Sequence, residues 1–195
     1  MLVIGLTGSI AMGKSEVAKI MASYNIPVFD SDAEVHKLYE SRAGADLIRP
    51  FVPEAAQTDK VDRKIITQHV LKNPELLGQL EKKVHAEIKR RRDIFIADAR
   101  KTSAKSVVID TPLLFETGAD KDMDVTIVVS SPLELQRSRA LSRPGMTVER
   151  LEMILSRQIP DQQKRQKADE IIENNSTLLE LSKSVETLLK KLKAI

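Results

Sequence analysis

The segment at residues 8–15 constrains the fold of this chain more than any other. It has the spacing G-x-x-x-x-G-K-S, follows the apolar run at residues 2–6 and precedes residues with helical apolar spacing. This strand, loop and helix context is the one in which the pattern binds phosphate. Its two glycines let the backbone turn N–H groups inward, and the next helix points the positive end of its dipole at the anion. We therefore expect the chain to bind a nucleoside triphosphate, since an ordinary glycine turn needs neither flanking element.

Individual loop residues have expected tasks. Lys14 is placed to reach the β- and γ-phosphates, and the hydroxyl of Ser15 is a candidate ligand of Mg²⁺. A carboxylate at position 16 favours the helix dipole but repels a nearby phosphate. The expected ATP-binding residues of this segment are Gly8, Ser9, Ile10, Ala11, Met12, Gly13, Lys14, Ser15 and Glu16.

Composition indicates a compact enzyme with small polyanionic substrates. The 195 residues suit one core domain with insertions. The net charge of +3 is weak support for nucleic-acid binding, and 3% aromatic residues without Trp argue against base stacking. Cysteine is absent, and the N-terminal apolar stretch is only a strand long. We expect a cytoplasmic protein that binds neither nucleic acid nor membrane.

Apolar runs alternate with amphipathic segments, which is typical of a parallel sheet covered by helices on both faces. The expected strands are residues 2–7, 26–29, 106–109, 125–129 and 168–172. Residues 33–102 form a helical insertion without strands, including a long helix opened by Pro74. The stripe Leu178, Leu181, Val185, Leu188 and Leu192 predicts a last helix that packs back on the core.

Three aspartates follow expected strands, where ligands bind in open α/β sheets. Asp30 and Asp32 end the second strand, and Asp32 is the candidate base for a phosphoryl acceptor, although either residue could instead cap the next helix. Asp110 ends the third strand and could contact magnesium through water. Its neighbour is Thr111 rather than a water-activating Glu, which disfavours an ATPase.

Basic residues follow the strand at residues 125–129. Gln136, Arg139 and Arg143 are spaced to share one helix face, from which two guanidinium groups could clamp a triphosphate. A solvated basic face is the alternative. Pro144 and Gly145 predict a turn that could form the tip of a lid.

Taken together, these motifs resemble the dephospho-coenzyme A kinase family of P-loop kinases, over essentially the whole chain. The most discriminating block is residues 112–116, which otherwise reads as a strand exit packed on the core. Ala11, Met12, Glu16 and Ala86 depart from the family pattern. The residues carrying the resemblance, besides the loop, are Asp30-Ser31-Asp32, His85, Asp110, Thr111, Pro112, Leu113, Leu114, Phe115, Glu116, Gln136, Arg139, Arg143, Gln158, Ala168, Asp169 and Asn174.

The resemblance implies a three-layer α/β/α P-loop NTPase fold with a five-stranded parallel sheet, a helical substrate-binding insertion and a lid. It implies transfer of the ATP γ-phosphoryl group to the ribose 3′-hydroxyl of dephospho-coenzyme A, with Mg²⁺. Catalytic roles would fall to Asp32, Lys14 and Arg139, and Asn174 would lie near the adenine. Besides Asp32, the acceptor would contact His85, Pro112, Leu113, Leu114, Phe115 and Glu116.

By the same resemblance, residues 1–32, 103–135 and 159–195 form the core, 33–102 the acceptor subdomain and 136–158 the lid of a monomer or weak homo-oligomer. Two alternatives remain: another small-molecule kinase, and a nucleotide-binding module without transfer. A regulatory GTPase would need Asp-x-x-Gly and Asn-Lys-x-Asp motifs, and the chain has neither.

Overall fold

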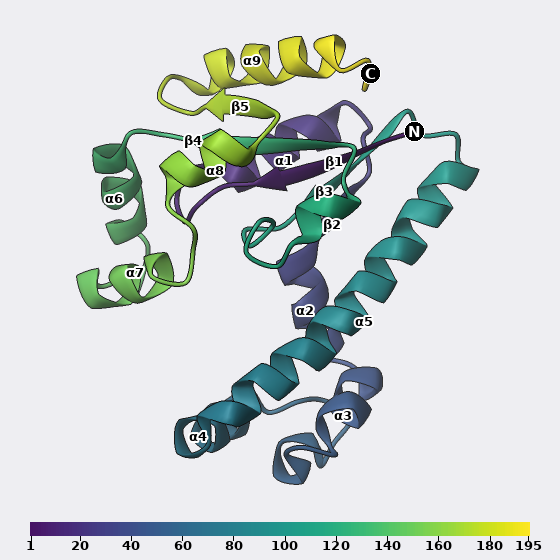
Figure 1. Ribbon diagram of the computed structural model, residues 1–195, viewed down its shortest axis with the longest axis vertical. Coiled ribbons are helices and arrows are strands. Elements are labelled where there is room, and N and C mark those ends of the chain that lie inside the picture. The colour runs from purple at the N-terminus through teal and green to yellow at the C-terminus, as the bar shows by residue number, and fades with distance from the viewer. The chain divides into compact units, whose positions relative to one another are not determined.

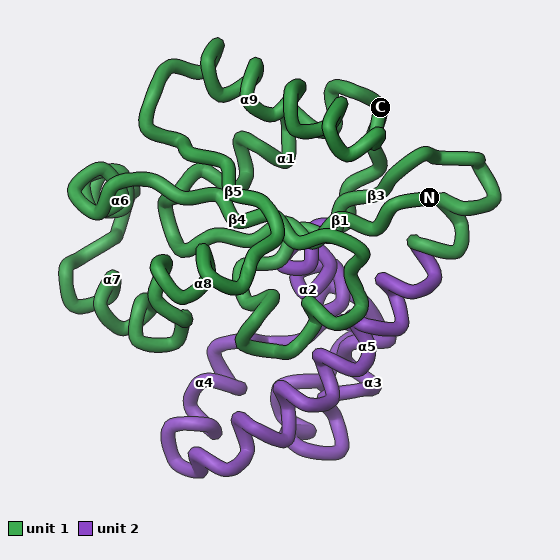
Figure 2. The backbone as a smooth tube through the Cα atoms, turned by 45° about the horizontal axis from the view of Figure 1, so that its top comes forward, with its two compact units in different colours: residues 1–29, 96–195 green, residues 30–95 purple.

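The chain divides into two compact units. The computed structural model describes residues 1–195. Residues 1–29 and 96–195 form one unit, which we call the sheet unit, and residues 30–95 form the other, the helical unit (Figure 2). Each unit has its own set of buried side chains.

The sheet unit is built on a five-stranded parallel sheet, as expected. Its strands are β1 (Leu2–Thr7), β2 (Val28–Asp30), β3 (Ser106–Asp110), β4 (Val125–Ser130) and β5 (Glu170–Glu173), in the order β2-β3-β1-β4-β5. In the parallel register of β1 and β3, Leu6 lies opposite Asp110. The carboxyl ends of these two central strands therefore meet at one edge of the sheet.

One face of the sheet is covered by α1 (Lys14–Ser23) and α9 (Leu178–Lys191) (Figure 1). The apolar stripe predicted for the last helix packs as expected, because Leu181, Val185 and Leu188 lie in the same core cluster as Ile4 of β1. Leu178 differs, being 59% exposed in the first turn of α9. That turn is fixed instead by a capping box between Thr177 and Glu180.

The opposite face carries turn residues 112–118, the short helix η2 (Ala119–Asp122) and α8 (Asp161–Lys167). Val128 of β4 packs there with Leu114 and Phe115, while its neighbours Ile127 and Val129 face the other cluster. This alternation is the period of two expected for a strand buried on both faces.

Two further helices, α6 (Leu133–Leu141) and α7 (Val148–Leu155), lie next to each other in Figure 1. Between them the chain makes the turn predicted at Pro144 and Gly145. Both helices belong to the sheet unit and follow β4.

Residues 33–102, which include most of the helical unit, contain no strand, as predicted. The helical unit comprises α2 (Ser31–Tyr39), α3 (Arg42–Ile48), η1 (Pro53–Ala56), α4 (Arg63–Lys72) and most of α5 (Pro74–Lys101). Leu80, Val84 and Ile88 form the buried stripe of α5, and Leu76 is half-buried. Arg91 of α5 donates to Glu34 of α2 at 3.4 Å and to Glu87 at 3.1 Å, which ties the two helices together.

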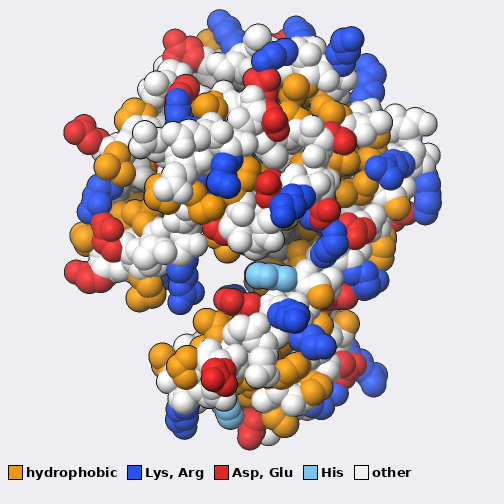
Figure 3. Space-filling view, viewed as in Figure 1, with side chains coloured by type: hydrophobic (Ala, Val, Ile, Leu, Met, Phe, Trp, Pro, Cys, Tyr) orange, Lys and Arg blue, Asp and Glu red, His pale blue; other side chains and the backbone are white.

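None of the helices combines the length with the apolar composition that a membrane-spanning segment needs. Acidic and basic side chains are interspersed over the face drawn in Figure 3. That distribution suits the small net charge of the chain.

Candidate active site

The loop between β1 and α1 needs its two glycines. Gly13 is the N-cap of α1 and has φ 97°, which L-residues rarely adopt. A Cβ at Gly13 would also overlap the side-chain nitrogen of Asn174, and one at Gly8 would lie 2.7 Å from the carbonyl oxygen of Val129. At these two positions the loop therefore packs too closely against its surroundings to accept a side chain.

Ala11 adopts the left-handed region with φ 62°, a conformation that is strained for a residue with a Cβ. Its methyl group is 7% exposed and packs in a small cluster with Ala140 and Leu151, against which Ile10 also lies. The strain at Ala11 is thus offset by burial of its methyl group between α6 and α7.

Lys14 and Asp110 form an ion pair at the carboxyl edge of the sheet. Asp110 is 3% exposed at the end of β3, and the Lys14 side chain is 15% exposed in the first turn of α1. Ser15 follows Lys14 in that turn. The structure thus brings together the cation, the hydroxyl-bearing turn and the carboxylate that the sequence places at this edge.

Three side chains that are distant in sequence hold the loop backbone. Asn174, directly after β5, donates from Nδ2 to the Met12 carbonyl at 2.9 Å. Gln136 donates from Nε2 to the Ile10 carbonyl at 2.9 Å, and Gln158 accepts from the Ile10 N–H at 3.1 Å. Asn174, expected near the adenine, therefore has its amide nitrogen engaged at the phosphate loop.

The expectation that Gln136, Arg139 and Arg143 share one helix face is wrong for Arg143. Helix α6 ends at Leu141, so Arg143 lies in the following turn and is exposed. Arg139 stays on the helix, half-buried, and donates to the Asn174 carbonyl at 3.1 Å. The helix stops because the Ser142-Arg143-Pro144-Gly145 sequence turns the chain.

The block at residues 112–116 has two kinds of surroundings. Leu114 and Phe115 are buried in the core cluster of the sheet, as the strand-exit reading predicts, whereas Pro112 and Leu113 are half-buried. Glu116 accepts from the Ile159 N–H at 2.8 Å and pairs with Lys164 at 2.8 Å.

Lys164 is the residue that sequence reasoning missed. It lies on α8 with 0% exposure and donates to the Pro112 carbonyl at 2.8 Å as well as pairing with Glu116. It stands in the polar run Asp161–Lys167, where nothing in the pattern separates a buried lysine from solvated ones. Its buried partner could be found only from the fold.

Asp169, part of the family resemblance, ties β4 to the residue before β5. Its carboxylate accepts from the hydroxyl and N–H of Thr126 at 2.7 and 2.8 Å. These hydrogen bonds lower the pKa of Asp169 below its ordinary value. The contacts of this residue are thus with the sheet.

In the helical unit, the structure separates the roles of Asp30 and Asp32. Asp30 is the N-cap of α2 and accepts from the Ala33 N–H at 2.9 Å. Asp32 lies exposed in the first turn of α2. His85 lies exposed on α5. The capping alternative therefore applies to Asp30 and leaves the carboxylate of Asp32 outside the cap.

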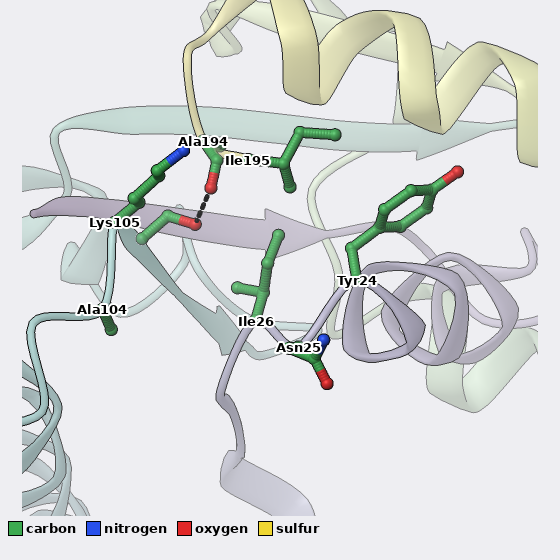
Figure 4. Close-up of a pocket in the computed structure, with 8 residues that line it drawn as sticks. Tyr24, Asn25, Ile26, Ala104, Lys105, Ala194 and Ile195 are labelled. Carbon is green, nitrogen blue, oxygen red and sulfur yellow. Dashed lines mark hydrogen bonds between the residues drawn. The ribbon is translucent and has the colours of Figure 1, made fainter.

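Each unit also contains a cavity. One of about 250 Å³ in the sheet unit is lined by Tyr24, Ile26, Lys105 and Ile195, beside a 2.9 Å hydrogen bond from Ser106 to the Ala194 carbonyl (Figure 4). It lies where β3 begins, at the opposite end of that strand from Asp110. One of about 600 Å³ in the helical unit is lined mainly by residues 54–65.

Comparison with known proteins gives concordant matches. Residues 2–180 match the family model described as dephospho-CoA kinase. A dephospho-CoA kinase of Agrobacterium fabrum is 44% identical over 194 residues, covering 100% of both chains. One of Rhodopseudomonas palustris is 43% identical over 178 residues, covering 91% of this chain and 89% of the relative.

Solved structures agree with these sequence matches. TT1252 from Thermus thermophilus superposes with a TM-score of 0.82 at 31% identity, covering 98% of this chain and 97% of the other. The dephospho-CoA kinase from Campylobacter jejuni gives 0.70 at 27% identity, with 97% and 96% covered. A shikimate kinase from Aquifex aeolicus gives 0.52 at 18% identity, with 98% of each covered, and so shares the fold.

Proposed function

This chain belongs to the dephospho-CoA kinase family, and we infer that it performs that family's reaction. It is a kinase that transfers the γ-phosphoryl group of ATP to the ribose 3′-hydroxyl of dephospho-coenzyme A, giving coenzyme A and ADP. This reaction is the last step of coenzyme A biosynthesis. The observation that carries the proposal is the Lys14 and Asp110 pair beneath a glycine loop, in a chain that matches the family from residue 2 to residue 180.

We assign the triphosphate to the loop at residues 8–15. The loop N–H groups and the start of α1 suit a bound anion, and Lys14 would leave Asp110 to contact the β- and γ-phosphates. Arg139 is assigned to neutralise charge on the transferring group, supported by its partial exposure on α6 beside the Asn174 backbone. Arg143, which lies beyond α6, is assigned a more peripheral contact with ATP.

We propose Asp32 as the general base. As the 3′-hydroxyl oxygen bonds to the γ-phosphorus, its proton passes to the Asp32 carboxylate, and the bond from phosphorus to the bridging oxygen breaks to release ADP. The engagement of Asp30 as helix cap supports this choice, because it leaves Asp32 as the candidate of the pair. The helical unit, with His85, would hold the acceptor.

We assign Ser15 to magnesium as a ligand and Asp110 as a contact through water. A hydroxyl and a carboxylate are hard oxygen donors, and no group of three or more acidic or His residues competes as a metal site. This sparse set fits an ion that takes most of its ligands from phosphate and water. When bound, Mg²⁺ neutralises charge on the triphosphate. Lys14 and Arg139 supply the chain's own share of that neutralisation.

The test is ADP formation from ATP with dephospho-coenzyme A as acceptor, beside reactions with adenosine, thymidine monophosphate and pantothenate. We expect turnover with dephospho-coenzyme A alone. Turnover with another acceptor would identify a different small-molecule kinase, and ATP binding without turnover would identify a binding module.

Asp32→Asn tests the base, with Asp30→Asn as its matched control. Loss of the proton acceptor is expected to lower kcat by about 10²- to 10⁴-fold. Asp30→Asn should remain close to the unsubstituted enzyme, because asparagine caps helices as well as aspartate does. Equal effects of the two variants would contradict the assignment.

A further inference from the structure

Two glutamine side chains form hydrogen bonds with the backbone of a single residue of the phosphate loop, one with its carbonyl and the other with its N–H. Gln136 donates to the carbonyl oxygen of Ile10 at 2.9 Å, and Gln158 accepts from the N–H of the same residue at 3.1 Å. One glutamine uses its amide nitrogen and the other its amide oxygen. Both backbone groups of Ile10 are therefore satisfied by side chains more than a hundred residues away in the sequence.

These contacts occur where the loop is most strained. Ile10 directly precedes Ala11, whose φ of 62° lies in the left-handed region. A non-glycine residue holds this conformation only where its surroundings fix it. Ile10 and Ala11 also pack against Ala140 and Leu151. Polar and apolar contacts thus act on the same two residues.

Gln136 and Gln158 stand at the two ends of the segment 136–158. Gln136 is 2% exposed on α6, and Gln158 is half-buried just beyond α7. The residue after it, Ile159, donates to Glu116 at 2.8 Å. The C-terminal end of the segment is therefore held by two contacts, one to Ile10 and one to Glu116. The position of the segment and the shape of the loop are consequently fixed by the same hydrogen bonds.

We propose that Gln136 and Gln158 are positioning residues that fix the Ile10 peptide and so preorganise the phosphate loop for ATP. The proposal rests on the proposed function for the identity of the ligand. A loop already held in its binding shape does not lose the corresponding conformational freedom when the triphosphate binds. Weakening either hydrogen bond should therefore weaken ATP binding without altering affinity for the acceptor.

The experiment measures the Kd of ATP by calorimetry, with KM for each substrate measured separately. Gln136→Met and Gln158→Met each remove one hydrogen bond at nearly constant volume. We expect each to raise the Kd and KM of ATP about tenfold, equivalent to about 1.4 kcal/mol, and to leave KM for dephospho-coenzyme A within twofold. Gln163→Met, at an exposed position of α8, should leave both unchanged.

Two glutamate variants that add the same charge distinguish a positioning role of the glutamines from general destabilisation of the fold. Gln158→Glu keeps an acceptor for the Ile10 N–H, whereas Gln136→Glu turns an acceptor toward the Ile10 carbonyl. We expect Gln158→Glu to bind ATP several-fold more tightly than Gln136→Glu, while thermal melting verifies that each variant is folded. Because both glutamines act through Ile10, the double methionine variant should lose less affinity than the two single losses multiplied.

Equal affinities of the two glutamate variants, or methionine variants that bind ATP within twofold of the unsubstituted protein, would overturn the proposal. ATP binding is measured without any acceptor, so it tests the glutamines even if dephospho-coenzyme A proves not to be phosphorylated. That second result would count against the proposed function alone.

Discussion

Two lysine–carboxylate pairs in the sheet unit have the same chemistry and different surroundings. In the pair of Lys14 and Asp110, the side chains are 15% and 4% exposed, and the lysine opens onto the phosphate loop. In the pair of Lys164 and Glu116, the lysine is 0% exposed and also donates to the Pro112 carbonyl. A lysine that reaches an open loop is able to exchange a carboxylate for a phosphate. A lysine enclosed by protein acceptors cannot exchange its carboxylate partner for a ligand, and instead it holds segments of the chain together.

The role of an ion pair depends on what else its two members contact. Glu116 accepts from Ile159 as well as from Lys164, which connects residues 112–116 to the beginning of α8. Desolvation makes such a closed pair costly to break and of little net value to form. For the open pair of Lys14 and Asp110, in contrast, we predict a contribution to ligand binding.

The largest effect is expected for Lys14→Met. Removing the cation that we assign to the β- and γ-phosphates should lower kcat/KM on the order of 10³-fold, measured by ADP formation. Lys19→Met is the matched control, because Lys19 lies on the same helix with its side chain 75% exposed, and it should keep near-normal activity.

The second effect concerns stability, and Lys164→Met tests it. Leaving Glu116 without its partner should cost about 3–5 kcal/mol in the free energy of unfolding, measured by denaturant titration. Lys167→Met, at an exposed position of the same helix, should cost little. If Lys164→Met were as stable as this control, the structural role of the Lys164 and Glu116 pair would be contradicted.

A double variant tests whether the unpaired carboxylate of Glu116 causes the loss of stability. Adding Glu116→Gln to Lys164→Met removes the unpaired charge and should recover part of the lost stability, since the penalty comes from the buried carboxylate rather than from the missing contact. No recovery would indicate that the Pro112 carbonyl is the important partner of Lys164.

These two pairs also mark how far sequence reasoning reaches. Lys14 was predictable because a loop motif fixes its distance from two glycines, and Asp110 because a strand ends there. The five parallel strands and the helical insertion followed from apolar periodicity in the same way. Local spacing carries this information, and the structure confirms the resulting fold.

Contacts between residues that are distant in the sequence leave no comparable pattern in the local sequence. The buried position of Lys164 and the engagement of Asn174 at Met12 depend on which segments meet in the fold. The extent of α6 was overestimated because a spacing of three and four residues fits a helix whether or not the helix continues to Arg143. Roles in binding and catalysis remain predictions at these positions.

A third ion pair, on the surface of the helical unit, extends the comparison to acid pH. Hydrogen bonds from Arg90, followed by those from Arg91, lower the pKa of Glu87 from 4.5 to about 2. Because the folded-state pKa lies below the unfolded value, its contribution is fully present above pH 4.5 and is lost as the pH falls toward 2. Solvent screening limits that contribution to about 1 kcal/mol.

The measurement is the free energy of unfolding at pH 6 and pH 3. The unsubstituted protein should lose roughly half of that contribution, about 0.5 kcal/mol, more than Glu87→Gln across this interval, because the variant has no carboxylate to protonate there. Glu81→Gln, an exposed change on the same helix, should follow the unsubstituted protein. If all three show the same acid dependence, the Glu87 pair contributes nothing measurable.

The smallest effect is expected at Ala11, where two contributions oppose each other. Ala11→Gly relieves about 1–2 kcal/mol of left-handed strain, and it loses about 0.8 kcal/mol of methyl burial together with about 0.5–1 kcal/mol of backbone entropy. The net change in the free energy of unfolding should therefore stay within about 1 kcal/mol. Ala18→Gly, equally buried in the helical conformation of α1, has no strain to relieve and should cost clearly more. If both variants lost the same stability, the left-handed conformation of Ala11 would carry negligible strain.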